Sequence, residues 1–217
     1  MITQLEAGEV RVLGALIEKE KTTPDYYPMT VNAIRVACNQ KSNRDPVMEL
    51  TENDVIDLIH SLDKKHYVWQ KPSVDSRVPK YAHRLTSLHD FTEGELAVLC
   101  VMFLRGPQTV GELRTRTHRM VNFDSLEGVH EVLKHLMDDD FGPFVVQLPR
   151  QAGSRESRYM HLFAGKEFPD QLVQGEQSAE TRVANGALEQ RVSALEMQLE
   201  VLKERLERLE SKLEREM

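Results

Sequence analysis

The sequence has few of the residues that mark redox proteins, metal proteins or membrane proteins. Its two cysteines, Cys38 and Cys100, lie far apart in apolar helical settings, so we expect buried structural thiols rather than metal ligands or catalytic groups. The longest apolar run, residues 96–104, is far shorter than the roughly 20 residues of a membrane span. No basic segment precedes an apolar core near Met1, which predicts no signal peptide and a cytoplasmic location.

Motifs typical of enzymes are also absent. The chain has no glycine-rich phosphate loop, no Gly-x-Ser-x-Gly, no His-Glu-x-x-His and no paired Cys-x-x-Cys. His130 and His135 are spaced wrongly for joint metal ligation from one helix face. The run Asp138–Asp140 is more typical of a solvated loop than of a cation site, which needs further oxygen ligands at defined spacing. We therefore expect a protein that is not an enzyme and binds no cofactor.

Charge gives little support to nucleic-acid binding by the chain as a whole. The net charge is −7. Residues 1–88 carry equal numbers of acidic and basic side chains, and residues 89–164 and 165–217 are both acidic. Any contact with nucleic acid must therefore depend on local clusters of basic residues.

An internal repeat divides the first 164 residues into two similar halves. The same order of matching stretches occurs in both: residues 8–13 with 94–99, 30–35 with 109–114, 55–62 with 129–136, and 81–83 with 159–161. The spacing drifts only as changes in loop length would produce. A duplicated domain accounts for this pattern better than chance does.

Each half is predicted to hold three helices and then a β-hairpin. Capping boxes, in which a hydroxyl and a carboxylate bond free backbone N–H groups, are predicted at Thr3/Glu6, Thr51/Asp54, Thr92/Glu95 and Thr109/Glu112. A further helix is expected from Thr30, burying Ile34 and Val36, and another over about 125–137. The expected hairpins pair residues 67–70 with 80–85 and 144–148 with 158–163, with Trp69 packed in the core rather than stacked on a base.

Three helices followed by a hairpin is the order of a winged helix, a helix-turn-helix with a β-hairpin wing. The sequence also resembles the YceH-type family of uncharacterised bacterial proteins, through residues 37–46, 112–117 and 119–120. The resemblance covers residues 5 to about 164 and implies two tandem winged-helix domains, without implying any activity. We expect a mainly α (α+β) chain divided into winged-helix domains at 1–88 and 89–164, a polar linker at 165–186 and a coiled coil at 187–217.

Basic residues near the loops and wings are the candidates for contact with DNA phosphates. They are Lys41, Arg44, Lys71, Arg77, Lys80 and Arg84 in the first half, and Arg114, Arg116, Arg119, Arg150, Arg155 and Arg158 in the second. Wing cations contact backbone phosphates in DNA-binding winged helices, and the planar fork of arginine can hold two oxygens. The competing interpretation is that these residues are ordinary surface cations or partners in internal salt bridges.

The acidic residues of the third helix in each half make sequence-specific recognition of DNA bases unfavourable. The first exposes Glu52, Asn53, Asp54 and Asp57, and the second exposes Asp124, Glu127 and Glu131. Carboxylates at these positions repel phosphates, whereas base-reading helices present Arg, Lys, Asn or Gln. Two hypotheses remain: weak DNA contact through wings and loops, or a protein–protein adaptor without DNA binding.

The segment from Arg35 to Arg44 is compatible with either use. It is rich in amides and hydroxyls, with Lys41 and Arg44 among them. Such a loop can hold a phosphate, or it can fix the turn between the second and third helices. The structural role is slightly favoured.

The last thirty residues carry a heptad repeat. Apolar residues recur at alternating intervals of four and three at Leu188, Val192, Leu195, Leu199, Leu202, Leu206, Leu209 and Leu213. A narrow apolar stripe on a charged helix needs a partner helix. Parallel pairing sets Arg191 opposite Glu196 and Arg205 opposite Glu210, whereas antiparallel pairing opposes mainly like charges. A parallel coiled-coil dimer is therefore predicted.

Deletion of residues 187–217 should lower the assembly state of the protein, because it removes the whole apolar stripe. Sedimentation of the full chain and the truncated chain at equal concentration measures this change. An oligomer of unchanged stoichiometry after the deletion would show that the tail does not hold the subunits together.

Overall fold

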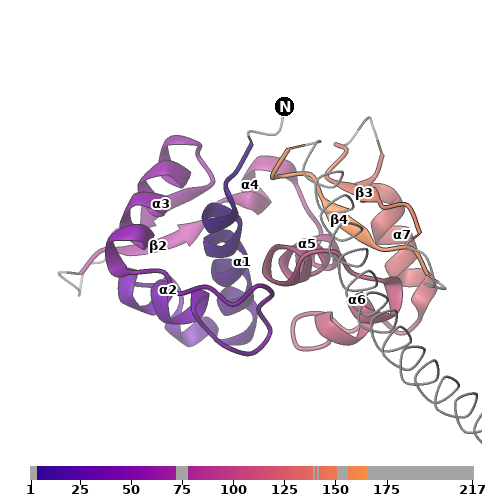
Figure 1. The fold of residues 1–217 in the computed structure, drawn as a ribbon, viewed down its shortest axis with the longest axis horizontal. Coiled ribbons are helices and arrows are strands. Elements are labelled where there is room, and N and C mark those ends of the chain that lie inside the picture. Colours follow the sequence, from indigo (N-terminus) through magenta and orange to yellow (C-terminus); the bar gives the residue numbers. More distant parts are fainter. Residues whose placement is uncertain (1–3, 72–77, 139, 141, 151–155, 166–217) are drawn as a thin grey trace, which may run out of the picture. The chain divides into compact units, whose positions relative to one another are not determined.

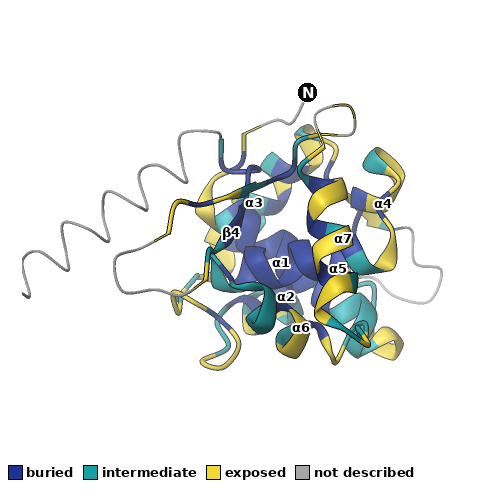
Figure 2. Cartoon of the chain, turned by 90° about the vertical axis from the view of Figure 1, so that its right-hand side faces the viewer, coloured by how far each residue is buried: buried dark blue, intermediate teal, exposed yellow. Residues whose placement is uncertain are grey.

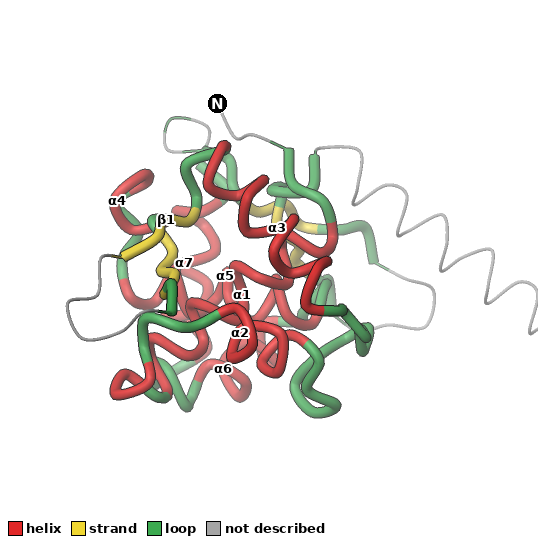
Figure 3. Tube along the Cα trace, turned by 90° about the vertical axis from the view of Figure 1, so that its left-hand side faces the viewer, coloured by secondary structure: helices red, strands yellow, loops and turns green. Residues whose placement is uncertain are grey.

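The described part of the chain is a helix-rich α+β structure with two small antiparallel sheets (Figures 1 and 3). The computed structural model describes residues 4–71, 78–138, 140, 142–150 and 156–165. One compact unit comprises Met1–Pro169 and a second comprises Asp170–Met217. The second unit, with every heptad position of the predicted coiled coil, lies outside the described residues, as do Arg77 and Arg155.

Helices and strands follow the same order in both halves of the first unit. The first half holds α1 (Ala7–Thr22), a 3₁₀ turn (Pro24–Tyr26), α2 (Val31–Cys38), α3 (Glu52–Lys64), β1 (Val68–Lys71) and β2 (Lys80–His83). The second half holds α5 (Glu93–Arg105), α6 (Val110–Thr117), α7 (Leu126–Leu136), β3 (Val145–Gln147) and β4 (Tyr159–His161). A short helix that the sequence pattern did not predict, α4 (Leu85–His89), connects the halves.

A single bridging residue from the loop after the first helix joins each hairpin. Met29 and Tyr81 exchange two backbone hydrogen bonds of 3.0 and 2.8 Å, and Gln108 and Tyr159 exchange two of the same lengths. Tyr81 and Tyr159 occupy matching positions of the internal repeat. The two halves therefore share their hairpin pairing as well as their order of elements.

Capping residues explain where most helices begin. Thr51 with Asp54, Thr92 with Glu95 and Thr109 with Glu112 form the predicted capping boxes of α3, α5 and α6. The start of α1 differs from the prediction: its capping box joins Glu6 to Glu9, whose carboxylate accepts the Glu6 backbone N–H at 2.7 Å. A carboxylate can accept the free backbone N–H groups as a threonine hydroxyl does, so the box forms three residues later.

Helices α1 and α5 pack against each other through the centre of the first unit. Every residue of α1 from Glu9 to Glu18 is buried, and so is every residue of α5 from Glu95 to Leu104. Figure 2 shows α1 as a dark-blue helix at the centre. A helix that is covered on all sides carries mainly apolar residues all round, as α5 does after Glu95. The covered stretch of α1 also includes Glu9, Arg11 and Glu18.

Gly14 allows this close crossing. A Cβ atom at position 14 would lie 2.9 Å from side-chain atoms of both Leu104 and Phe103. The Cys100 thiol also donates to the Gly14 carbonyl across the crossing, at 3.3 Å. Both cysteines are buried and free, as predicted.

Two predictions of burial were wrong. Val36 is 54% exposed, because it lies on the outer face of α2 while Ile34 and Ala37 enter the core. Trp69 is 38% exposed, because side chains alternate along β1 and Val68 takes the inward position. The ammonium of Lys71 lies 5.4 Å from the centroid of the Trp69 ring, within the range of a cation–π contact.

Gly14→Ala should destabilise the protein by about 1–3 kcal/mol, because the added methyl group overpacks the crossing of α1 and α5. Gly111→Ala is the matched control, since a Cβ atom there meets nothing within 4 Å and alanine favours the helix by about 0.4–1 kcal/mol. Urea unfolding of both variants measures the difference. Equal stability of the two variants would contradict the tight crossing.

Candidate nucleic-acid interface

Arg44 is buried, which corrects its place among the phosphate-binding candidates. Its side chain is fully covered, and its guanidinium donates to both carboxylate oxygens of Glu18, at 3.2 and 2.6 Å. Two of its nitrogens also donate to the Ala37 carbonyl. A guanidinium whose donors are used inside the fold cannot hold a phosphate at the surface. The geometry therefore supports the structural role of the segment from Arg35 to Arg44, which fixes the turn between α2 and α3.

Arg11 is a second buried arginine, and the sequence pattern did not single it out. It lies on α1 and is 1% exposed, and it donates to the Cys38 carbonyl at 3.1 Å and to the Pro46 carbonyl at 2.6 Å. Arg11 and Arg44 together attach the loop between α2 and α3 to α1. The only sequence signal for this role was a charge within an apolar helix.

In the second half, three candidate arginines are engaged within the fold. Arg158 donates to Glu112 and to the Pro107 carbonyl, both at 2.8 Å. Arg116 lies 3.3 Å from the same glutamate, at the i,i+4 position of α6. Arg114 donates to two backbone carbonyls just before α7, at 3.2 and 2.8 Å. Each of the three remains at least partly exposed.

Glu112 is the centre of this cluster. Burial alone would raise its pKa, but the Thr109 backbone N–H and the charges of Arg158 and Arg116 lower it. The carboxylate is therefore ionised at neutral pH and offsets part of the positive charge beside it. As a result, this cluster is less basic than the sequence suggests.

The first hairpin places two lysines directly opposite each other. Lys71 on β1 pairs with Lys80 on β2 at the end of the described ladder. Like charges at directly opposed positions destabilise a sheet, so this arrangement favours a bound anion. Arg84 is exposed just after β2, and the exposed Trp69 lies beside Lys71.

The remaining described candidates are exposed at separate places. Lys41 lies in the loop between α2 and α3, Arg119 follows α6, and Arg150 follows the second hairpin's first strand. Arg119 and Arg150 make no hydrogen bond or ion pair within the described part of the chain. Among the candidates in the described part of the chain, those not engaged with a carboxylate or carbonyl inside the fold are therefore Lys41, Lys71, Lys80, Arg84, Arg119 and Arg150.

The third helices present acidic residues to solvent, as the sequence predicted. Glu52, Asp54 and Asp57 are exposed on α3, and Glu127 and Glu131 are exposed on α7. The Thr51 backbone N–H and hydroxyl lower the pKa of Asp54, which keeps it ionised. Neither helix is suited to enter the major groove, because its carboxylates would face phosphates.

The described residues contain no cluster of His, Cys, Asp or Glu that could hold a metal ion. Within the same residues, no helix is long and apolar enough to cross a membrane.

Residues 5–154 match a protein family described as "Protein of unknown function, DUF480". The chain belongs to this family. Among its relatives, a UPF0502 protein of Vibrio campbellii is 52% identical over 170 residues, which cover 76% of this chain and 78% of the relative. One of Vibrio parahaemolyticus is 48% identical over 200 residues, covering 89% and 92% of the two chains. One of Serratia proteamaculans is 48% identical over 167 residues, covering 75% and 78%.

This membership confirms the bacterial family that the sequence resembles. Most of the resemblance came from residues 37–46, which form the end of α2 and the loop after it. In the structure this stretch includes Arg44 and supplies carbonyls to Arg11 and Arg44. Its unusual composition therefore reflects a loop that is held by two buried arginines.

Arg44→Met should destabilise the fold by about 3–5 kcal/mol at pH 7, because it leaves the Glu18 carboxylate buried without its partner. The double variant Arg44→Met/Glu18→Met should recover part of that loss. Burial alone would raise the pKa of Glu18, but bonding to Arg44 outweighs it and lowers the pKa. The pair's contribution is thus present at neutral pH and is lost as the pH falls below the ordinary glutamate value.

Urea unfolding at pH 7 measures these differences. Lys41→Met is the matched control, since it removes an exposed cation from the same loop and should change stability by less than about 0.5 kcal/mol. A loss for Arg44→Met no larger than that of the control would contradict the role of this ion pair.

Proposed function

We propose that each half of the first unit is a winged-helix domain. The order of helix, bridging residue, helix, helix and hairpin supports this assignment, since it occurs twice at matching positions. The boundary proposed from the sequence, between residues 88 and 89, falls at the C-terminal end of α4 (Leu85–His89), just before α5. The same proposal includes a coiled coil over 187–217.

We propose that the protein is a cytoplasmic, non-enzymatic regulatory or DNA-associated protein that contacts phosphates through its wings and loops. The opposed Lys71 and Lys80 carry this proposal, because a phosphate between them would relieve their repulsion. Trp69 beside them offers an exposed aromatic face. The acidic α3 and α7 favour backbone contact with little sequence preference over insertion into a groove.

Pairing through the proposed coiled coil would strengthen such contacts. Each chain offers two wings, and a parallel dimer gathers four of them at one end of a stalk. Individually weak phosphate contacts then combine through effective concentration. A protein of net charge −7 would then be able to bind DNA through contacts that are each weak.

Titration of duplex DNA binding against salt tests the proposal. Each neutralised phosphate should contribute about −0.9 to the slope of log affinity against log salt. Lys71→Gln/Lys80→Gln should weaken binding and reduce the magnitude of the slope by about 0.9, the contribution of the one phosphate held between the two lysines. The matched control is Lys64→Gln/Lys134→Gln, which removes the same charge from exposed positions on α3 and α7.

The two double variants distinguish DNA contact through the first hairpin from DNA contact through α3 and α7. A larger effect of the control would place the contact on α3 and α7. No binding of the unaltered protein at low salt would exclude the DNA function altogether.

The alternative function, a protein–protein adaptor, is favoured by exposed apolar residues on α2 and in the loop between α2 and α3. Val36 is 54% exposed and Val47 is 52% exposed, and Val47 lines a surface hollow with Met48 and Leu50. A partner would cover these residues, since burial of exposed valines is favourable. Absence of DNA binding, with loss of a co-purifying partner in Val36→Glu/Val47→Glu, would support this alternative.

A further inference from the structure

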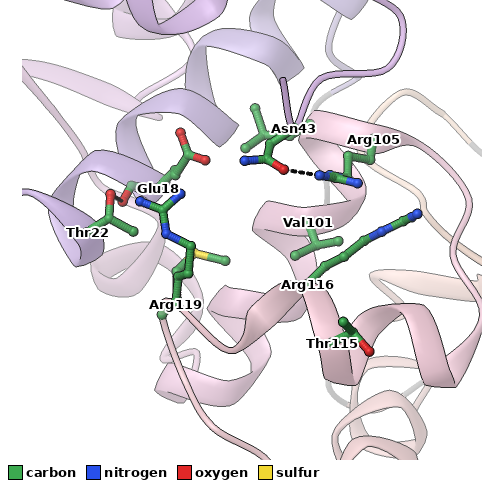
Figure 4. A pocket seen from close by; sticks show the side chains of 10 residues that line it. Glu18, Thr22, Asn43, Val101, Arg105, Thr115, Arg116 and Arg119 are labelled. Carbon is green, nitrogen blue, oxygen red and sulfur yellow. Dashed lines mark hydrogen bonds between the residues drawn. The ribbon is translucent and has the colours of Figure 1, made fainter. Parts of the chain in front are cut away.

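A cavity of about 260 Å³ lies between the C-terminal ends of α1 and α5 (Figure 4). Glu18 and Thr22 line it from α1, and Val101 and Leu104 form an apolar wall on α5. The loop after α2 contributes Asn43. The cavity is therefore built from both halves, at the point where they meet.

Three arginines line this cavity: Arg105 at the end of α5, Arg116 on α6 and Arg119 just after α6. Glu18 is the only carboxylate among the lining residues, and it already accepts hydrogen bonds from the buried Arg44. Burial lowers the pKa of Arg105, and the charges of Arg116 and Arg44 lower it further. Positive charge is thus in excess around the cavity.

The free donors of the cavity lie on opposite sides of it. Figure 4 shows Arg119 directed toward Thr22 and Glu18, with Arg105 and Arg116 across the cavity. Arg119 has no hydrogen bond within the described part of the chain. The Asn43 amide oxygen accepts a hydrogen bond from Arg105, which leaves the Asn43 amide nitrogen facing the space between.

Other groups of the cavity are already engaged. Arg116 donates to Gln108 and pairs with Glu112. It therefore contributes positive charge to the cavity, but its donors are already partly used. The hydroxyls of Thr22 and Thr115 donate to carbonyls of their own helices. An incoming ligand would therefore be held by Arg105, Arg119 and Asn43, against the apolar side chains of Val101 and Leu104.

We propose that this cavity binds a compact anion with clustered charged oxygens, a phosphoryl group or a small dicarboxylate. Guanidinium groups hold such oxygens in pairs, and the apolar wall strengthens the attraction by excluding water. Ligand pockets for drug-sized molecules range from about 300 to 1,000 Å³, so this smaller cavity suits a compact anion. The proposal does not depend on DNA binding.

Binding at this point would also link the two halves more firmly. The Asp45 backbone N–H donates to the Leu104 carbonyl at 2.8 Å, and Arg105 donates to Asn43. An anion held by Arg105, Arg119 and Asn43 adds a third connection between the loop after α2 and the second half. Ligand binding to the folded state then raises the temperature of unfolding.

Isothermal titration calorimetry and thermal unfolding of the full chain test the proposal. The probes are inorganic phosphate, pyrophosphate and succinate, with sodium chloride at matched ionic strength as the reference. At least one of the three probes should bind and raise the unfolding temperature above the chloride reference. Phosphate or pyrophosphate binding without succinate binding identifies a phosphoryl ligand, and the reverse pattern identifies a dicarboxylate.

Arg119→Gln should weaken the binding by about tenfold to hundredfold, because it removes a charged donor. Arg84→Gln is the matched control, since Arg84 is exposed and does not line the cavity. Thr115→Asp is a second variant, which places a competing carboxylate at the cavity and should also weaken binding. Circular dichroism confirms that each variant is folded.

Three outcomes would overturn the proposal. The first is that none of the probes binds at millimolar concentration. The second is that Arg84→Gln weakens binding as much as Arg119→Gln does, or that both cavity variants bind normally. The third is that duplex DNA displaces the bound probe, which would assign these arginines to a nucleic-acid surface instead.

Discussion

The close crossing of α1 and α5 is the constraint on which the described structure depends. Both helices are covered along most of their length, and Gly14 lets them approach until a methyl group would clash with Leu104. The buried residues of the two similar halves therefore form one continuous core. This shared core brings the loop after α2 to the end of α5, and it creates the cavity that contains Arg105 and Arg119.

Burial of α1 has a consequence for its charged residues. Glu9, Arg11 and Glu18 all lie within the covered stretch, and each has a partner: Lys65 for Glu9, backbone carbonyls for Arg11, and Arg44 for Glu18. Unpaired charges at such positions would cost several kcal/mol, so the partners are structural requirements. Arg44, which the sequence offers as a phosphate-binding candidate, therefore pairs inside the fold. The candidate interface is reduced to the exposed cations of the loops and hairpins.

Local patterns were sufficient to predict most elements. The capping residues Thr51, Thr92 and Thr109 marked helix starts correctly, because a cap and its partner are only three residues apart. The positions of both hairpins followed from the internal repeat. Trp69 and Val36 were misplaced, because which face of a short strand or helix turns inward depends on what packs against it. The candidate site was predicted less well, since several of its cations bond to distant residues.

The sequence by itself determined the family, the duplicated order of helices and hairpins, the free buried cysteines and the acidic surface of the third helices. These properties depend on residues close together in the chain or on their composition. Only the tertiary structure decided that Arg44 serves Glu18, twenty-six positions away, and that Lys71 faces Lys80. It also decided that arginines at the ends of α5 and α6 line one cavity. Such pairings depend on how α1 and α5 cross, and spacing along the chain does not encode that geometry.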